Sequence, residues 1–255
     1  MGYYARGIVD SSNDWPIQSA NKGVTRLLEA GIPLEGAEHT DRLLKLGWWV
    51  RASDRERSAS NWQPERGPVS LMRGPLLVLA GSCIGSDEAD ETALAKLREL
   101  LAGYQGTIVS GGTNSGIARL AGDLQAASKA GALHTVGYIP VAVPGGIERW
   151  VDRRCAEHRR STGRDFSILE PLIFWGDYLA GGGKPGDVRL IGFSGGATAS
   201  GEFRIALALG AHVGIIQGSG RAADVLLADP LWKDHERLSV LTLSMDSLDG
   251  FLKGT

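Results

Sequence analysis

The stretch that decides the fold is Ile191-Gly-Phe-Ser-Gly-Gly-Ala-Thr-Ala-Ser-Gly-Glu202, together with its continuation to Gly218-Ser-Gly-Arg-Ala-Ala-Asp224. Short apolar runs at 188–193 and 212–216 are typical of buried parallel strands. Glycines end each run, and a helical segment that opens at Gly201-Glu202 stands between them. The stretch therefore predicts glycine turns at the carboxyl ends of two strands. Open α/β sheets bind ligands at that edge, and helix N-termini there favour anions.

The same unit of strand, glycine turn and helix recurs upstream. Further apolar runs lie at 76–80, 107–110, 134–139 and 239–243, and helical patterns lie at 91–104 and 117–130. Alternation of this kind predicts a parallel sheet with right-handed crossovers. We therefore expect an α/β fold, a Rossmann-like parallel sheet of about five strands with helices on both faces.

Residues 1–70 differ from the rest of the chain. Four of the seven tryptophans fall there: Trp15, Trp48, Trp49 and Trp62. Helical patterns at 21–30 and 36–46 precede a charged, Ser-rich linker at 51–67. We expect a small, mainly helical segment over 1–70 and a nucleotide-binding domain over 71–255.

The segment 140–187 is the least regular part of the predicted domain. Residues 148–160 carry five arginines and have a helical pattern, while 165–180 predicts a buried helix with Pro171 near its start. The basic segment is open to two interpretations, a phosphate clamp or a solvated helix face.

Composition limits the classes of function. The chain has 255 residues and a formal net charge of −2, which gives no reason to expect nucleic acid or an anionic membrane as a partner. Cys83 and Cys155 are too few for a disulfide framework, and the histidines show no metal-ligand spacing. No apolar run is long enough for a membrane span, and the N-terminus lacks the apolar core of a signal peptide. We expect a cytoplasmic protein without a metal site.

Three turns carry candidate chemistry. In the turn 111–116, Thr113 and Asn114 are either donors to a phosphate or ribose or helix N-caps. Glu202 holds ribose hydroxyls, acts as a general base, or complements a helix dipole. Arg221 suits bidentate binding of a phosphate, or it forms a local ion pair with Asp224.

Three motifs together resemble the SLOG superfamily over residues 74–250. They are Thr107-Ile-Val-Ser-Gly-Gly-Thr-Asn-Ser-Gly-Ile117, His134-Thr-Val-Gly-Tyr-Ile-Pro140 and Gln217-Gly-Ser-Gly-Arg-Ala-Ala-Asp224. They are most similar to the LSDAT branch, which bacteria share with the N-terminal region of melastatin-type TRP channels. The resemblance implies binding of an NAD-derived nucleotide such as ADP-ribose. The implied ligand-binding residues are Gly81, Ser82, Gly111, Gly112, Thr113, Asn114, Gly195, Gly196, Thr198, Glu202, Gly218, Ser219, Gly220 and Arg221.

The superfamily also contains LOG-type phosphoribohydrolases, with the motif Pro-Gly-Gly-x-Gly-Thr-x-x-Glu and a catalytic Arg–Glu pair. Here Ser194-Gly-Gly-Ala-Thr-Ala-Ser-Gly-Glu202 keeps the glycine pair and the Glu but lacks the Pro and the Gly-Thr. Glu202 is thus the one residue matching a catalytic position, and no second clear acid is visible.

Residues 19–49 also resemble a short RyR-like domain, through Ser19-Ala-Asn-Lys, Ala37-Glu-His39 and Leu46-Gly-Trp-Trp49. Three hypotheses follow for the whole chain. They are a nucleotide sensor that needs no further cofactor, a phosphoribohydrolase, and an assembly protein with a vestigial pocket. A homodimer or an effector protein is the expected partner.

Overall fold

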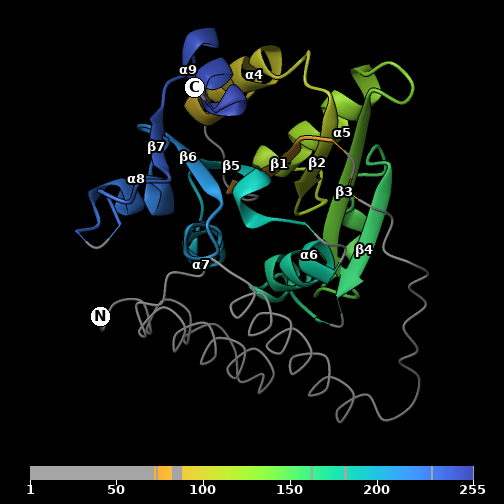
Figure 1. Ribbon diagram of the computed structural model, residues 1–255. Helices are drawn as coiled ribbons and strands as arrows, with labels where there is room; N and C mark the ends of the chain where they lie inside the picture. Colours follow the sequence, from red (N-terminus) through yellow and green to blue (C-terminus); the bar gives the residue numbers. More distant parts are fainter. Residues whose placement is uncertain are drawn as a thin grey trace.

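The structure, a computed structural model, describes Met72 and residues 74–81, 88–161, 163–180, 183–230 and 232–254. Its centre is a sheet of seven strands, all parallel, in the order β4-β3-β2-β1-β5-β6-β7 (Figure 1). The strands are β1 (Leu76–Gly81), β2 (Gly106–Ser110), β3 (Leu133–Pro140), β4 (Glu157–Ser161), β5 (Val188–Phe193), β6 (His212–Ile216) and β7 (Leu238–Leu241).

The strand order places a topological switch between β1 and β5. From β1 the chain adds strands outward on one side, through β2 and β3 to β4. It then returns to pair β5 with β1 and adds β6 and β7 on the other side. Crossovers on the two sides leave in opposite directions, so a crevice opens outside the carboxyl ends of β1 and β5. The sequence predicts this edge as the ligand site.

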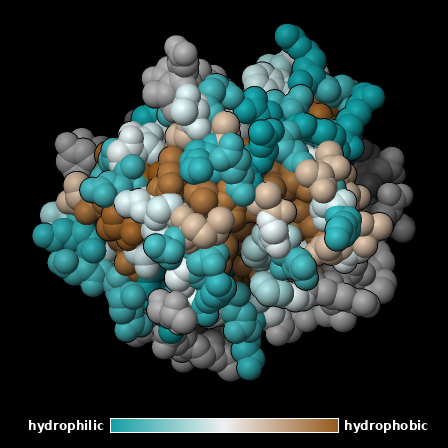
Figure 2. All heavy atoms as spheres, turned by 90° about the horizontal axis from the view of Figure 1, so that it is seen from above, coloured by the Kyte–Doolittle hydropathy of each residue, from teal (hydrophilic) through white to brown (hydrophobic). Residues whose placement is uncertain are grey.

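Helices cover both faces of the sheet. The helices are α4 (Glu88–Leu100), α5 (Arg119–Ala127), α6 (Leu169–Ala180), α7 (Ala197–Ala208), α8 (Arg221–Ala228) and α9 (Met245–Lys253). One core packs α6, α7 and α8 against the sheet, and a second core packs α4, α5 and α9 against the other face. Viewed from the side of α4 and α9, the surface is mostly hydrophilic, with hydrophobic residues showing in a broken band (Figure 2).

The buried strands follow from their sequences. Leu76, Leu77, Val78 and Leu79 of β1 are all buried, alternately in one core and the other. A central strand covered on both faces needs such a continuous apolar run. The Rossmann-like α/β prediction is confirmed, with seven strands in place of about five. Residues 1–70, with their predicted helices and RyR-like motifs, lie outside the described residues.

The segment 148–160 is not the predicted helix. It contains a short 3-10 turn, Ile147–Arg149, and then the edge strand β4, which pairs with β3. Arg159 of β4 is buried because Glu157, Tyr138 and Asp177 surround its guanidinium. These partners compensate the charge, so a strand with a polar sequence is stable at this edge.

Several helix boundaries also differ from the prediction: α4 spans 88–100 rather than 91–104, and α5 spans 119–127 rather than 117–130. Helix α7 begins at Ala197, four residues before the predicted start at Gly201. Helix α6 begins at Leu169 rather than at 165. Within the described parts of the chain, no helix combines the length and apolar character needed to cross a bilayer.

Candidate functional site

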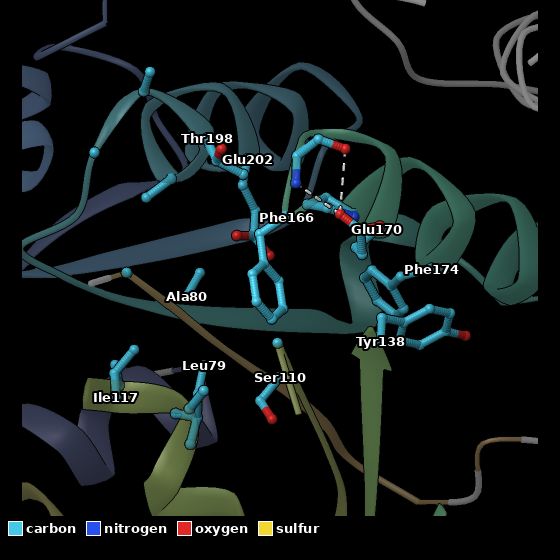
Figure 3. Close-up of a pocket in the computed structure, with 18 of the residues that line it drawn as sticks. Leu79, Ala80, Ser110, Ile117, Tyr138, Phe166, Glu170, Phe174, Thr198 and Glu202 are labelled. Carbon is cyan, nitrogen blue, oxygen red and sulfur yellow. Dashed lines mark hydrogen bonds between the residues drawn. The ribbon is translucent and has the colours of Figure 1, made fainter. Parts of the chain in front are cut away.

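A cavity of about 470 Å³ lies at the switch point of the sheet (Figure 3). Its floor comes from the ends of β1 and β2, including Gly81, Ser110 and Gly111, and its walls come from α6 and the start of α7. Arg221, at the first position of α8, closes one side. The volume falls within the range for small-molecule sites, which are mostly apolar with a few convergent polar groups.

The turns after β5 and β6 form one hydrogen-bonded unit. The amides of Ala222 and Ala223 donate to the carbonyls of Gly195 (3.1 Å) and Ser194 (3.0 Å). The Ser219 hydroxyl accepts from the Ser194 amide (3.0 Å) and donates to the Ile216 carbonyl (2.7 Å). Gly218-Ser-Gly220 does not itself line the cavity. It supports the turn after β5, whose Gly196 does line it.

The start of α7 is shaped to receive an anion. Gly195 has φ +100°, and a Cβ there would lie 2.5 Å from the Cβ of Ala199, so only glycine fits. A Cβ on Gly196 would lie 3.7 Å from Nη2 of Arg221, so the guanidinium sits beside the helix N-terminus. The backbone amides of the first helical turn, the helix dipole and a guanidinium together favour a phosphate or carboxylate.

The backbone of Arg221 has φ +53°, a left-handed conformation uncommon for a non-glycine residue. The turn before it is closed by the carboxylate of Asp224, which accepts from the amides of Gly218 and Gly220, each at 3.1 Å. A strained residue held in place by its surroundings and facing a cavity is a common feature of ligand sites.

Glu202 lies in the second turn of α7, not in the first turn as predicted, because the helix begins at Ala197. The dipole role therefore does not apply, since it fades beyond the first turn. Its side chain is partly exposed and lines the cavity (Figure 3). Burial of the carboxyl, and secondarily the neighbouring Glu170, raise the pKa of Glu202 to about 8.

Glu170 is a second acid at the cavity and is not among the residues predicted from the sequence. One oxygen accepts from the amide (2.8 Å) and the hydroxyl (3.3 Å) of Ser167, and the other accepts from the Ser161 hydroxyl. Burial raises the pKa of Glu170 to about 7, while these hydrogen bonds act to lower it. Ser167-x-x-Glu170 has the spacing of a capping box, a signal that the sequence does contain.

Aromatic rings make up much of the remaining wall. Tyr138 of β3 and Phe174 of α6 meet edge to face with ring centroids 5.8 Å apart, and Trp150 and Phe166 do so at 6.3 Å. Phe166 is 36% exposed although it lines the cavity. These rings make this part of the wall apolar.

The turn after β2 contributes less than predicted. Gly111 lines the cavity, whereas Thr113 and Asn114 instead contact the loop that follows residue 147. The Asn114 amide donates to the Trp150 carbonyl (2.7 Å), and its side-chain oxygen accepts from Arg154 Nη2 (2.9 Å). The turn thus holds the loop that brings Trp150 to the cavity.

The predicted residues therefore divide into two groups. Those lining the cavity are Gly81, Gly111, Gly196, Thr198, Glu202 and Arg221. Those outside the lining are Gly112, Thr113, Asn114, Gly195, Gly218, Ser219 and Gly220. Ser82 lies outside the described residues.

The arginines of 149–160 do not form a clamp at this cavity. All five are described, and none is part of its lining. Arg154 binds Asp152 and Asp123, and Arg159 is held in the buried network of β4. Among the described lining residues, Arg221 is the only Lys or Arg, against three acids: Asp165, Glu170 and Glu202.

No family model matches the sequence, and no curated protein matches it. The fold is similar to that of the molybdenum cofactor binding protein from the phototrophic bacterium Rippkaea orientalis, with 15% identity, a TM-score of 0.50, and coverage of 72% of this chain and 98% of that chain. It is also similar to TM1055, a structural genomics target, with 14% identity, a TM-score of 0.51, and coverage of 71% of this chain and 100% of that chain. At these identities the likeness establishes a shared Rossmann-like fold.

Proposed function

We propose that the chain is a ligand-binding member of the SLOG superfamily, close to its LSDAT branch, and that the cavity binds an NAD-derived or ADP-ribose-like nucleotide. The observation that carries the proposal is the position of Arg221, whose guanidinium lies beside Gly196 at the N-terminus of α7. This places a fixed cation and backbone amides at one end of an otherwise largely apolar cavity. A nucleotide has the same distribution, with a charged phosphate at one end and a planar, largely apolar ring at the other.

The remaining walls suit the rest of such a ligand. The ring of Phe166, which is exposed, lies in the cavity, the buried rings of Phe174 and Tyr138 add apolar surface to its wall, and Thr198 offers a hydroxyl near the anion end. Because Arg221 is the single lining cation among the described residues, the site favours a ligand with few phosphates over a triphosphate.

A phosphoribohydrolase is the second candidate. Glu202 follows Gly196 by six residues, as the Glu of the LOG-type motif follows its second glycine, and it lines the cavity. Hydrolysis of an N-glycosidic bond generally uses two acid–base groups. The other carboxyl, Glu170, already accepts from Ser161 and Ser167, and no arginine of 149–160 joins it. Binding without turnover is therefore the first choice.

The experiment is calorimetry of the pure protein with AMP, ADP-ribose, NAD and the molybdenum cofactor, which the Rippkaea orientalis protein is named for binding. Product chromatography follows each titration. We expect saturable heat with AMP or ADP-ribose and no free base. Released base would establish the hydrolase instead. A response to the molybdenum cofactor alone would replace the nucleotide, and no response to any ligand would favour the assembly role.

A further inference from the structure

Building on the proposed function, we propose that Glu202 binds the ligand as a neutral carboxylic acid and recognises a ring nitrogen beside an exocyclic amino group. The cavity would then select an adenine-type ring over a guanine- or pterin-type ring. Glu202 then has a specificity role at this site instead of a catalytic one.

The first step is the position of Glu202. It lies six residues beyond Gly196, on the order of 9 Å along the axis of α7 at 1.5 Å per residue. A phosphate at Gly196 and Arg221 would thus be separated from the carboxyl by about the length of a sugar and a ring. Figure 3 shows Glu202 reaching from α7 toward the cavity, with Glu170 of α6 on the same side and Ser110 on the opposite side of the cavity.

The second step is that Glu170 is already engaged. Both of its oxygens accept hydrogen bonds from Ser161 or Ser167, which fix its position at the start of α6. Glu202 has a different setting, since its partly exposed side chain lines the cavity. Of the two acids, Glu202 is the better placed to meet a ligand.

The third step concerns the charges that face Glu202. Glu170 and Asp165 come from α6 and the loop before it, and Arg221 comes from α8; the hydroxyl of Tyr138 points away from Glu202 and is engaged with Asp177 and Arg159. Burial and the adjacent Glu170 raise the pKa of Glu202 to about 8, so the group holds its proton at neutral pH. A phosphate that neutralised Arg221 would favour the neutral form further.

The fourth step is hydrogen-bond complementarity. A carboxylic acid has one O–H donor and one carbonyl acceptor side by side. It can donate to a ring nitrogen and accept from the neighbouring amino group, which is the edge of adenine. An ionised carboxylate only accepts, and therefore suits the ring N–H and amino donors of guanine and pterin rings. The protonation state thus decides which ring is bound.

The test compares AMP with GMP by calorimetry at pH 6.5 and 9.5, because the two ligands differ only in the ring. We expect AMP to bind at least about tenfold more tightly than GMP at the lower pH, the scale set by one mispaired polar edge. AMP affinity should fall by about thirtyfold at pH 9.5, as the protonated fraction falls. GMP binding equal to or tighter than AMP binding at pH 6.5, or AMP affinity that rises with pH, would overturn the inference.

Two variants sharpen the result. Glu202→Gln keeps a donor and an acceptor but cannot ionise, so AMP should bind within about threefold of the wild-type affinity at pH 6.5, with little change at pH 9.5. Glu202→Ala should lose about tenfold at pH 6.5. Loss of AMP binding in a folded Glu202→Gln protein would contradict the inference while leaving nucleotide binding intact. Absence of binding of AMP, ADP-ribose and NAD to the wild-type protein would overturn the proposed function as well.

Discussion

Glu202 and Glu170 place two carboxyl groups around one largely apolar cavity, and their pKa values link stability to pH. Both values are raised in the folded state, to about 8 and about 7, from an ordinary value of 4.5. Between about pH 4.5 and about pH 8, the folded chain therefore binds more protons at these two carboxyls than the unfolded chain does. Stability is therefore lost as pH rises.

We predict that the contribution of this pair to the free energy of unfolding falls as pH rises from about 4.5 to about 8. Urea unfolding of the wild type and of the double variant Glu170→Gln/Glu202→Gln, at several pH values, measures it by difference. Other titrating groups cancel in that comparison. A difference that is constant with pH, or that changes in the opposite direction, would show that the two carboxyls ionise normally.

Arg221 supports a second prediction at this scale, on affinity. Arg221→Ala should weaken nucleotide binding by about 1.5–3 kcal/mol, the range for hydrogen bonds to charged groups. The matched control is Arg98→Ala, which removes an exposed arginine of α4 remote from the cavity lining. Calorimetry measures the nucleotide dissociation constant of both variants. Equal constants would show that Arg221 does not contribute to binding.

At the scale of elements, helix α6 carries Glu170 and Phe174, and its far end is fixed by a buried network. The Tyr138 hydroxyl donates to Asp177 (3.1 Å) and accepts from Arg159 Nη1 (3.0 Å), and Arg159 and Asp177 approach to 3.6 Å. The network joins α6 to β3 and β4. It therefore fixes the wall of the cavity as well as the edge of the sheet.

Asp177→Ala should lower the free energy of unfolding by about 2 kcal/mol, since it leaves a buried hydroxyl and a buried guanidinium with fewer partners. The control is Asp249→Ala, whose partner is the exposed Lys253 and whose loss should cost under about 0.5 kcal/mol. Chemical denaturation measures both. Similar values for the two variants would argue that the buried network adds nothing.

The turn between β5 and α7 supports a further prediction. Gly195→Ala would place a methyl group 2.5 Å from the Cβ of Ala199 at φ +100°. We expect a loss of about 2 kcal/mol in stability, within the range for strained backbone, together with weaker ligand binding. Gly103→Ala is the matched control, because a Cβ there would meet nothing within 4 Å. Equal stability of the two variants would mean that the turn is not as tight as the structure has it.

At the scale of the whole molecule, the strand order brings together segments that are far apart in sequence. The ends of β1, β2 and β5 meet at one edge, and α6 closes over them. Strands β5 and β6 match the predicted apolar runs at 188–193 and 212–216. They could be predicted because a central parallel strand must be apolar throughout, and an apolar run is visible in the sequence.

Other parts of the structure could not be predicted from the sequence, because they depend on contacts with residues of other elements. Strand β4 is polar, and Arg159 is buried only because Asp177 and Tyr138, from other elements, compensate its charge. Similarly, Glu170 belongs to the cavity through the docking of α6, which no local pattern reports. Glycine turns predict the edge of the sheet that holds the site. They do not distinguish glycines that face the cavity, such as Gly196, from those that support it, such as Gly218.

The most direct test of nucleotide binding in the switch-point cavity is amide hydrogen exchange with and without saturating ADP-ribose. Binding should slow exchange at residues 194–202 and 221–224, which form the proposed anion site and bear Glu202. Helix α9 packs on the other face of the sheet and serves as the internal reference. Slower exchange at these two segments, with α9 unchanged, is the predicted result. Saturable binding that leaves both segments unchanged would contradict the account.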